Sequence, residues 1–278
     1  MSASPQWLTV VRGEAPLLVS VPHAGTEIPA NLEAQFVSPW LARKDTDWYV
    51  RELYEFAASL GATIVSTAIS RSVIDVNRDP SGASLYPGQA TTELCPRTTF
   101  DGEPLYRDPA TLTAGDVGLR REYYFRPYHA ALGAELDRLR RQYSSVVLYD
   151  AHSIRSRVAR LFAGELPVLN IGSFGGRSCA APLGSAIEQV CAASVFTHVV
   201  NGRFQGGYIT RHYGDPARGI HALQMELACR GYLREPDGPL TSDNWPPAYD
   251  PAVAQPLQEV LRAVLLACID CAQTERGV

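Results

Sequence analysis

Short runs of aliphatic residues alternate along the chain with longer amphipathic stretches. The longer stretches carry apolar residues at helical spacing, and they predict helices at residues 47–60, 116–142, 183–193 and 252–273, the second of them bent at Pro127. The short runs lack polar alternation, which is typical of strands buried on both faces. They predict strands at residues 17–21, 62–67, 73–77, 145–150, 167–171 and 221–227. The alternation of the two patterns predicts an α/β fold, a three-layer helix–sheet–helix sandwich with a mixed, mostly parallel sheet.

Two segments do not fit this simple pattern. Residues 79–112 are rich in Pro, Gly, Thr and Asp and show no period, and a loop of that length inside a compact domain usually has a function, such as a lid or a substrate loop. Residues 196–214 predict a pair of strands joined by the glycine-rich Asn201–Gly207. Because the chain has no internal repeat and no low-complexity linker, we expect one catalytic domain over residues 1–278.

Three of the predicted strands end at polar clusters that could carry chemistry. The clusters are Pro22-His23-Ala24-Gly25, Asn77-Arg78-Asp79-Pro80 and Asp150-Ala151-His152-Ser153. In an open α/β sheet, ligands bind at the carboxyl ends of the strands. If the three strands are neighbours, two imidazoles, several carboxylates and an arginine converge on one crevice. This set suits a mononuclear metal hydrolase, which keeps one coordination position open for water.

A metal held by His23 and His152 needs a carboxylate as its third ligand. Asp47 could instead cap the helix that it opens, and Asp150 could orient a histidine rather than bind the metal. Zn²⁺ fits two histidines and a carboxylate best, although Co²⁺, Mn²⁺ or Fe²⁺ could occupy the same ligands. The carboxylates near the two histidines are Glu27, Asp45, Asp47 and Asp150.

Glu226 stands inside an apolar run, where a carboxylate is unlikely to be buried without a partner. It fits a general base whose pKa is raised by loss of solvent. The alternative is a salt bridge with Arg230, four residues further along.

Cationic and amide side chains favour an acidic substrate. Asn77 and Arg78 could form a fork that clamps a carboxylate, and Arg71 is a second basic candidate. The alternative for Arg78 is pairing with a neighbouring aspartate. The glycine-rich segment 201–214 has no phosphate-loop Lys-Ser/Thr, so we interpret it as an active-site loop, with a simple hairpin as the alternative.

Composition narrows the classes of partner. The net charge of −4 offers no basic stripe for nucleic acid. No apolar run approaches the roughly 18–20 residues of a membrane helix, the densest being residues 263–269. The N-terminus lacks the basic and apolar regions of a secretory signal, and the six cysteines are scattered. We therefore expect a cytoplasmic protein with reduced thiols that binds a small molecule.

Ten segments spread over residues 17–230 can be compared with known families. They are SVPHAGTEIP, DTDWYVRELY, SRSVIDVNRDP, LYPG, FDGEPLY, RPYH, DAHSIRS, LNIGSFGG, NGRFQGGYITRHYGDP and GIHALQMEL. Together they resemble the N-formylglutamate amidohydrolase (deformylase) family, in the order in which the family has them. That family is similar in turn to zinc carboxypeptidases and aspartoacylases.

The resemblance implies hydrolysis of N-formyl-L-glutamate to formate and L-glutamate in histidine degradation, on a zinc-carboxypeptidase-like fold. The carboxypeptidase-type pattern places its acidic ligand at the position of Thr26, and Glu27 comes one residue too late, so the resemblance favours Asp47. The implied zinc ligands, for one zinc ion, are His23, Asp47 and His152, and the implied general base is Glu226. Asn77 and Arg78 would bind the substrate carboxylate, with Arg71 and Arg211 as further anchors, and the oxyanion would lie against zinc and a cation such as Arg78 or Arg211. Thr210, Arg211 and His212 are further candidates for substrate binding from motif membership. Alternatives are another zinc-dependent N-acyl amino acid hydrolase, a carboxypeptidase-like enzyme, or a non-enzymatic module that binds acidic amino acids.

Overall fold

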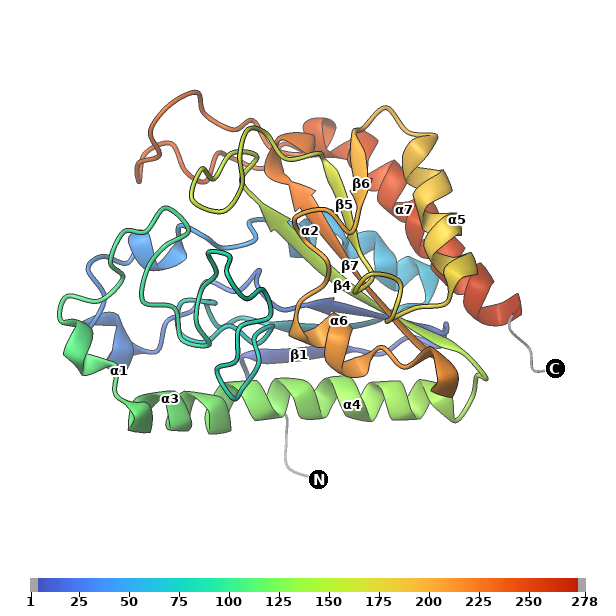
Figure 1. Cartoon of the computed structure of the whole chain (residues 1–278), viewed down its shortest axis with the longest axis horizontal. Coiled ribbons are helices and arrows are strands. Elements are labelled where there is room, and N and C mark those ends of the chain that lie inside the picture. The colour runs from blue at the N-terminus through green and yellow to red at the C-terminus, as the bar shows by residue number, and fades with distance from the viewer. Residues whose placement is uncertain (1–4, 275–278) are drawn as a thin grey trace.

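Seven strands form one mixed sheet in the computed structural model, which describes residues 5–274 (Figure 1). The sheet order is β1-β3-β2-β4-β7-β5-β6. Strand β2 is parallel to β3 and β4, β4 to β7, and β5 to β6, whereas β1 and β5 run antiparallel to β3 and β7. The strands are β1 (Leu8–Val11), β2 (Leu17–Val21), β3 (Thr63–Thr67), β4 (Val146–Ile154), β5 (Leu169–Gly172), β6 (His198–Val200) and β7 (Ile220–Ala228). The mixed, mostly parallel sheet confirms the predicted fold class.

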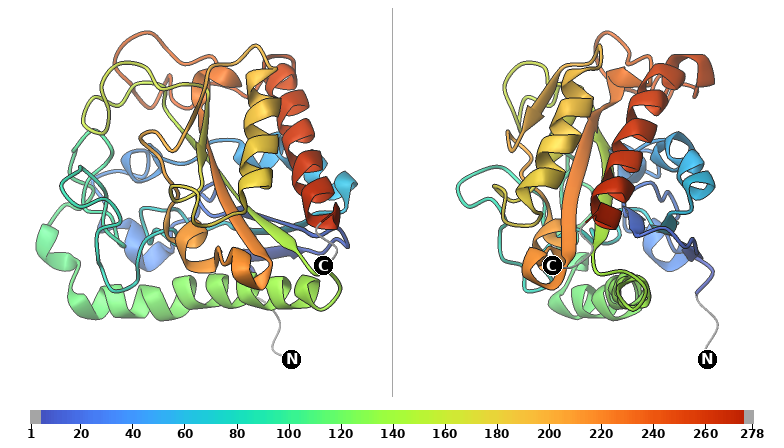
Figure 2. Two further views of the ribbon diagram at one scale, coloured as in Figure 1. Left: turned by 45° about the vertical axis from the view of Figure 1, so that its right-hand side comes forward. Right: turned by 90° about the vertical axis from the view of Figure 1, so that its right-hand side faces the viewer.

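Helices cover both faces of this sheet, because alternate residues of the central strands enter two separate hydrophobic clusters. Leu17 of β2 packs in the cluster of α5 (Ala181–Ala192) and α7 (Pro251–Thr274), whereas Leu18 packs in the cluster of α4 (Arg126–Arg140). Figure 1 shows α4 along the lower side of the sheet, and Figure 2 shows α5 and α7 side by side. The strands are therefore buried on both faces, as their unbroken apolar runs predict.

Two of the predicted helices are interrupted. In place of one helix at 47–60, α2 (Val50–Leu53) follows Tyr49, whose φ is 60°, and a 3-10 helix spans Glu55–Leu60. In place of one helix at 116–142, α3 (Ala114–Arg120) passes through a π-helical turn (Arg121–Phe125) into α4. Pro127 lies in the first turn of α4. It has no backbone N–H to donate, and its ring needs room against the preceding turn, so the π-helical turn before it accommodates both effects.

Residues 73–77 do not form a strand, which corrects the prediction. Val73 and Val76 are buried, but the backbone N–H of Val73 donates to the carbonyl oxygen of Ser70 in a local turn, and the N–H of Asp75 donates to the carbonyl oxygen of Leu94 in the 79–112 segment. The 79–112 segment, which contains a 3-10 turn at Pro109–Thr111, covers this run instead of a sheet neighbour. Burial under a loop gives the same apolar pattern as burial in a sheet.

The segment 196–214 is only partly a strand pair. Strand β6 is short, and the second half forms the helix α6 (Tyr208–Tyr213). Strand β1 was not predicted from the sequence. The remaining short elements are α1 (Ala30–Glu33) and the 3-10 turns Leu41–Arg43, Pro216–Arg218 and Cys229–Gly231.

Among the described residues, α7 is long and apolar enough to cross a membrane by length and composition, with a mean hydropathy of 1.4 over an 18-residue window. The expectation that no apolar stretch reaches this length is wrong for α7. Its Leu257, Leu261 and Leu265 are fully buried in the core shared with α5. Packing against the sheet therefore accounts for the apolar face of this helix.

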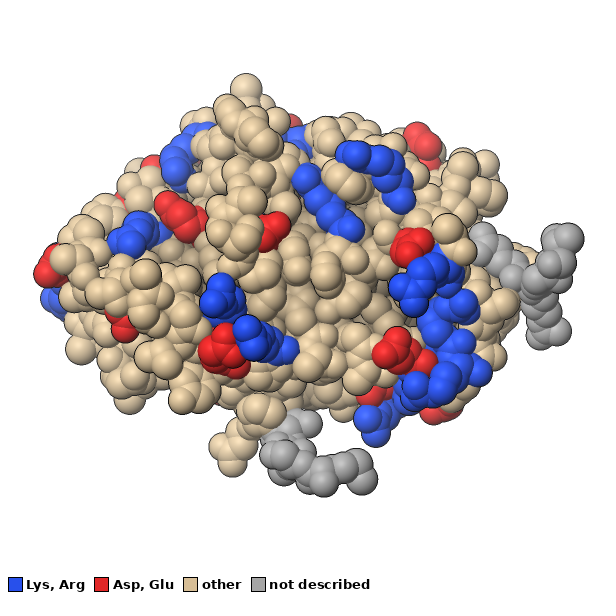
Figure 3. Space-filling view, turned by 60° about the horizontal axis from the view of Figure 1, so that its bottom comes forward, with Lys and Arg blue, Asp and Glu red and all other residues tan. Residues whose placement is uncertain are grey.

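The face that carries α4 mixes charges of both signs (Figure 3). Arg12 and Arg138 both pair with Glu135 of α4, at 2.8 and 2.6 Å. The arginines that gather on this side are thus partly neutralised by carboxylates.

Candidate active site

Three potential metal ligands meet at the carboxyl ends of the central strands. His23 follows β2, Asp47 precedes α2, and His152 lies inside β4, which continues further than the sequence pattern predicts. One ligand atom from each lies within 4.8 Å of the other two, and all three side chains are buried. The backbone N–H of Asp47 donates to the carbonyl oxygen of His23 at 3.0 Å, which fixes two of the three relative to each other.

Each imidazole is held by a carboxylate on the nitrogen that faces away from this meeting point. Nε2 of His23 lies 2.7 Å from Oδ1 of Asp75, and Nε2 of His152 lies 2.9 Å from Oδ2 of Asp150. The two Nδ1 atoms face Oδ2 of Asp47, at 3.7 Å from His23 and 3.1 Å from His152. Carboxylates placed in this way orient a metal-binding imidazole and raise its basicity.

The donor set fits a divalent metal ion. Nδ1 of His23 is buried and has no hydrogen-bond partner among residues 5–274, which is costly for a buried polar atom. Two imidazole nitrogens and one carboxylate oxygen are ligands that zinc accepts in catalytic sites. Glu27 is exposed, Asp45 pairs with Arg155 at 3.2 Å, and Asp150 holds the far side of His152, so the geometry favours Asp47 as the third ligand.

Asp47 is prepared to carry a negative charge. Burial alone would raise its pKa, but His152, His23 and Arg71 together hold the pKa well below its usual value. Likewise, burial alone would lower the pKa of His152, yet Asp150 and Asp47 raise it well above its usual value. The pocket floor is thus a dense array of buried opposite charges, a common property of functional sites.

Arg71 is occupied by this array. Its Nη1 lies 3.0 Å from Oδ1 of Asp47, and its Nη2 lies 2.8 Å from Oδ2 of Asp75. The guanidinium also lies over the ring of Phe100, with 4.8 Å between its carbon and the ring centroid. The geometry favours a role in bracing the two aspartates, beside the substrate contact that the resemblance implies.

The side-chain amide of Asn77 is hydrogen-bonded through both its nitrogen and its oxygen. Its Nδ2 donates to Oδ2 of Asp150 and lies 2.9 Å from Nε2 of His152, and its Oδ1 accepts from the backbone N–H of Ile209. Arg78 donates to both oxygens of Thr92 and keeps a partly exposed guanidinium in the pocket wall. Nη1 of Arg78 also lies 3.5 Å from Oδ2 of Asp75, which is the pairing with a neighbouring aspartate considered from the sequence. Of Asn77 and Arg78, Arg78 is the one whose side chain stays partly exposed at the pocket.

Glu226 lies beside the histidines because of strand register. It is the cross-strand partner of His152 in the β4–β7 ladder. Its Oε2 accepts a hydrogen bond of 2.9 Å from Nε2 of Gln224, whose Oε1 accepts from the backbone N–H of Gly207. Burial raises the pKa of Glu226 to about 7. Arg230 pairs with Glu165 instead, so the salt bridge considered from the sequence is not formed.

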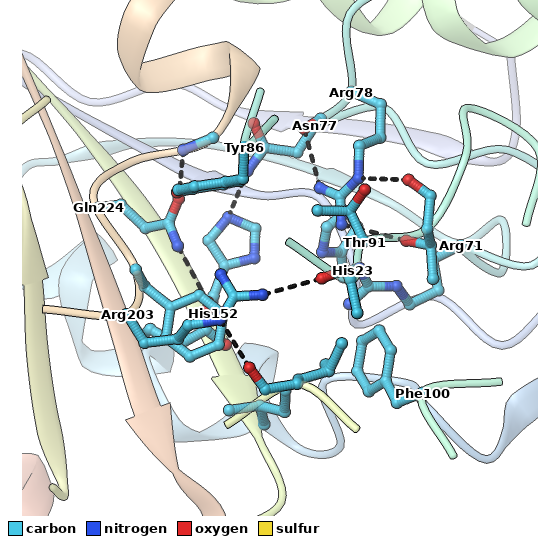
Figure 4. A pocket seen from close by; sticks show the side chains of 17 residues that line it. His23, Arg71, Asn77, Arg78, Tyr86, Thr91, Phe100, His152, Arg203 and Gln224 are labelled. Atoms are coloured by element: carbon cyan, nitrogen blue, oxygen red, sulfur yellow. Dashed lines mark hydrogen bonds between the residues drawn. The ribbon is translucent and has the colours of Figure 1, made fainter. Parts of the chain in front are cut away.

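A pocket opens over these groups (Figure 4). Sequence reasoning did not single out its residues Tyr86, Phe100, Arg203 and Gln224, nor Asp75 as the partner of His23. Arg203 lies in the segment NGRFQGGYITRHYGDP, but nothing in the sequence around it marks it as a pocket residue. The lining consists of His23, Arg71, Asn77, Arg78, Tyr86, Ala90, Thr91, Thr92, Phe100, His152, Ile154, Leu161, Arg203, Phe204, Gly207, Gln224 and Glu226.

Three residues expected from motif membership lie on α6, outside this lining. Thr210 is fully buried, and Arg211 donates to the carbonyl oxygens of Gly206 and Leu85. The ring of His212 stacks on Tyr208, with 4.8 Å between centroids. Their contacts favour a role in holding the loops around the pocket rather than direct contact with a substrate.

Comparison with known proteins finds relatives that match almost the whole chain. The chain is 44% identical to an N-formylglutamate deformylase of Pseudomonas putida, covering 94% of this chain and 95% of that protein. It is 42% identical to an N-formylglutamate deformylase of Pseudomonas aeruginosa, covering 93% and 94%. In fold it is similar to the crystal structure of an N-formylglutamate amidohydrolase from Ralstonia eutropha JMP134, with a TM-score of 0.77, 24% identity and coverage of 99% and 100%.

The match to a family covers most of the chain. Residues 15–233 match the N-formylglutamate amidohydrolase family, and this range contains every residue placed in the site above. The chain therefore belongs to the N-formylglutamate amidohydrolase family.

Proposed function

We propose that this chain hydrolyses N-formyl-L-glutamate to formate and L-glutamate, with a divalent metal ion, zinc in the first place, bound by His23, Asp47 and His152. The names of the two Pseudomonas relatives support the substrate. The observation that carries the proposal is the placement of Glu226 next to this ligand group at the floor of a pocket walled by arginines.

The ligand group supplies what metal-assisted hydrolysis needs. A divalent ion bound there would act as a Lewis acid and make water acidic enough to serve as the nucleophile near neutral pH. Asp75 and Asp150 orient the two imidazoles, and Arg71 holds the carboxylates of Asp47 and Asp75 in place. The same ligands would accept Co²⁺, Mn²⁺ or Fe²⁺.

Glu226 moves the proton. Its carboxylate takes a proton from the attacking water, whose oxygen forms a bond to the formyl carbon, and it passes that proton to the amide nitrogen as the C–N bond breaks. A pKa raised to about 7 by burial suits both steps near neutral pH. The hydrogen bond from Gln224 fixes the orientation of the carboxylate throughout.

Arg78 meets the negative charge of the substrate. Its guanidinium is anchored by Thr92 and by the carbonyl oxygen of Asn77, and it faces the pocket. Preorganised cations are worth most in a partly dry site, either on a substrate carboxylate or on the oxygen that gains charge during attack. Direct substrate contact by Thr210, Arg211 and His212 is not part of this proposal.

The test is formate release from N-formyl-L-glutamate, with N-acetyl-L-glutamate alongside, before and after treatment with a chelator and after adding zinc back. The proposal expects turnover of the formyl compound that chelation abolishes and zinc restores. Turnover of the acetyl compound alone would point to a different N-acyl amino acid hydrolase. No turnover of either compound by protein that holds metal would contradict the proposal and favour a binding module.

A further inference from the structure

Arg203 stands in the pocket as a cation without a carboxylate partner. Its guanidinium donates from Nε to the carbonyl oxygen of Leu161 at 2.8 Å and from Nη2 to the carbonyl oxygen of Ala90 at 2.9 Å. It forms no ion pair with a carboxylate among residues 5–274. Most other arginines near the site, such as Arg71 and Arg155, are neutralised by aspartates.

The guanidinium of Arg203 is held in a fixed position. It lies between the rings of Tyr86 and Phe204, with 5.3 Å from its carbon to each centroid. Cation–π contacts and hydrogen bonds to neutral carbonyls orient the group but leave its charge uncompensated. The two bonds occupy Nε and Nη2, so Nη1 remains available toward the pocket that Arg203 lines.

Two cations therefore face one pocket. Figure 4 shows Arg78 and Arg203 approaching it from different sides. Partial burial lowers the pKa of Arg203, and the charge of Arg78 acts in the same direction, whereas Tyr86 and Glu226 act in the opposite direction. A ligand with two separate carboxylates can pair with both guanidinium groups at once.

The positions of the two arginines distinguish the two carboxylates of a glutamate. Nη1 of Arg78 lies 3.5 Å from Oδ2 of Asp75, and Asp75 contacts the imidazole of His23. Arg78 is therefore next to the candidate metal ligands. In an N-formyl amino acid the α-carboxylate is close to the amide nitrogen, and the side-chain carboxylate of glutamate is two carbon atoms further away. The arginine that adjoins the ligand group fits the nearer carboxylate, and Arg203 is left for the farther one.

We propose that Arg203 is a specificity-determining residue that binds the side-chain carboxylate of the N-formyl dicarboxylic amino acid. This inference rests on the function proposed above. It makes Arg203 responsible for choosing glutamate over a neutral side chain, and it leaves the chemistry at Glu226 untouched.

The test measures kcat/KM for three substrates: N-formyl-L-glutamate, N-formyl-L-glutamine, which lacks the side-chain charge, and N-formyl-L-isoglutamine, which lacks the α-charge. We expect Arg203→Gln to lose about 100-fold on the two substrates that carry the side-chain carboxylate. On N-formyl-L-glutamine the variant should stay within about threefold of the unaltered protein, which also shows that it is folded. Arg203→Lys, which keeps the charge but not the fork, should recover part of the loss.

The matched control is Arg177→Gln. Arg177 is an exposed arginine that also lies over an aromatic ring, Phe174, and donates to a backbone carbonyl, but it does not line the pocket. This variant should behave as the unaltered protein with all three substrates.

An equal loss on all three substrates would overturn the inference, because it would indicate a structural role. A loss on N-formyl-L-glutamine with little loss on N-formyl-L-isoglutamine would also overturn it, since Arg203 would then bind the α-carboxylate. If the unaltered protein released no formate from N-formyl-L-glutamate, the proposed function itself would be wrong, and the inference would fall with it.

Discussion

The floor of the pocket and its wall are carried by different kinds of structure. On the floor, His152 and Glu226 are neighbours in the ladder of two central strands, and His23 follows a third strand beside them. The wall consists of loop residues, among them Arg78, Tyr86 and Arg203, which are fixed through backbone carbonyls and aromatic rings. Strand register fixes the positions of His152 and Glu226 relative to each other, whereas loops can adapt the wall to a ligand.

The two regions also differ in their electrostatics. On the floor the candidate metal ligands are paired with buried groups of opposite charge, as Asp47 is with Arg71 and His152, and Glu226 is held by the neutral amide of Gln224. On the wall Arg203 is fixed by neutral carbonyl oxygens, and Arg78 is fixed by the oxygens of Thr92 together with a longer contact of 3.5 Å to Asp75, so positive charge stays available for a ligand. Changes on the floor should therefore affect metal binding and turnover, and changes on the wall should affect substrate affinity and choice.

The largest expected effect is on the floor. Glu226→Gln keeps the shape of the side chain but removes the proton acceptor, so kcat should fall by about 10²–10⁴-fold while bound metal is retained. The measurement is formate release together with metal content. Glu135→Gln, which changes another buried glutamate far from the pocket, is the control and should leave kcat unchanged. Near-native turnover in Glu226→Gln would show that another group is the base.

The next effect concerns the junction between floor and wall. His129 of α4 lies 2.8 Å, through Nε2, from the carbonyl oxygen of Val76, just before Asn77. Burial lowers the pKa of His129 from 6.5 to about 4. Between these pH values the unfolded chain binds a proton that the folded chain does not, so stability should fall by about 3 kcal/mol as the pH drops from about 6.5 to about 4.

The measurement is the free energy of unfolding in denaturant across this pH range, for the unaltered protein and for His129→Gln. The difference between the two gives the contribution of His129 to stability. The variant lacks the titrating ring, so its free energy of unfolding should change less steeply with pH. An identical slope in both proteins would show that His129 does not remain neutral in the folded state.

A smaller effect is expected from the groups that orient the metal ligands. Asp75→Asn weakens the hold on Nε2 of His23 and should reduce metal affinity by about 10–100-fold. The control is Asp45→Asn, which alters another buried aspartate paired with an arginine but does not contact a histidine. Metal titration of both variants is the measurement, and equal loss of affinity in the two would mean that only general destabilisation is observed.

The smallest effect should come from the wall. Tyr86→Phe removes a hydroxyl that donates to the carbonyl oxygen of Gly206 and accepts from the N–H of Gln205. We expect KM to rise about fivefold with kcat unchanged, because a single hydrogen bond in a loop is worth about 1 kcal/mol. Steady-state kinetics would contradict the distinction between floor and wall if kcat fell and KM did not change.

The same distinction decides what could be predicted from the sequence. Strands β2, β4 and β7 follow from their apolar runs, and the fold class follows from the alternation of elements. Glu226 attracted notice because a carboxylate in an apolar run is unusual. His23 and His152 were found as histidines at the predicted strand ends.

The wall could not be predicted in this way. Residues 73–77 are apolar because a loop covers them, and no local pattern separates this from a strand. Helix α6 is short and rich in β-branched and aromatic residues, and its second N–H, from Ile209, is bonded by the side chain of Asn77 far away in sequence. The role of Arg203 depends on which loops surround it, and hydrophobic periodicity carries no information about loops.

The most direct test of the central claim is a zinc titration of metal-free protein, with bound zinc and formate release from N-formyl-L-glutamate measured on the same samples. The account predicts that activity rises in proportion to bound zinc and stops rising at one zinc per chain, and that Asp47→Ala fails to reach this level. Full activity in protein shown to contain no metal would contradict it.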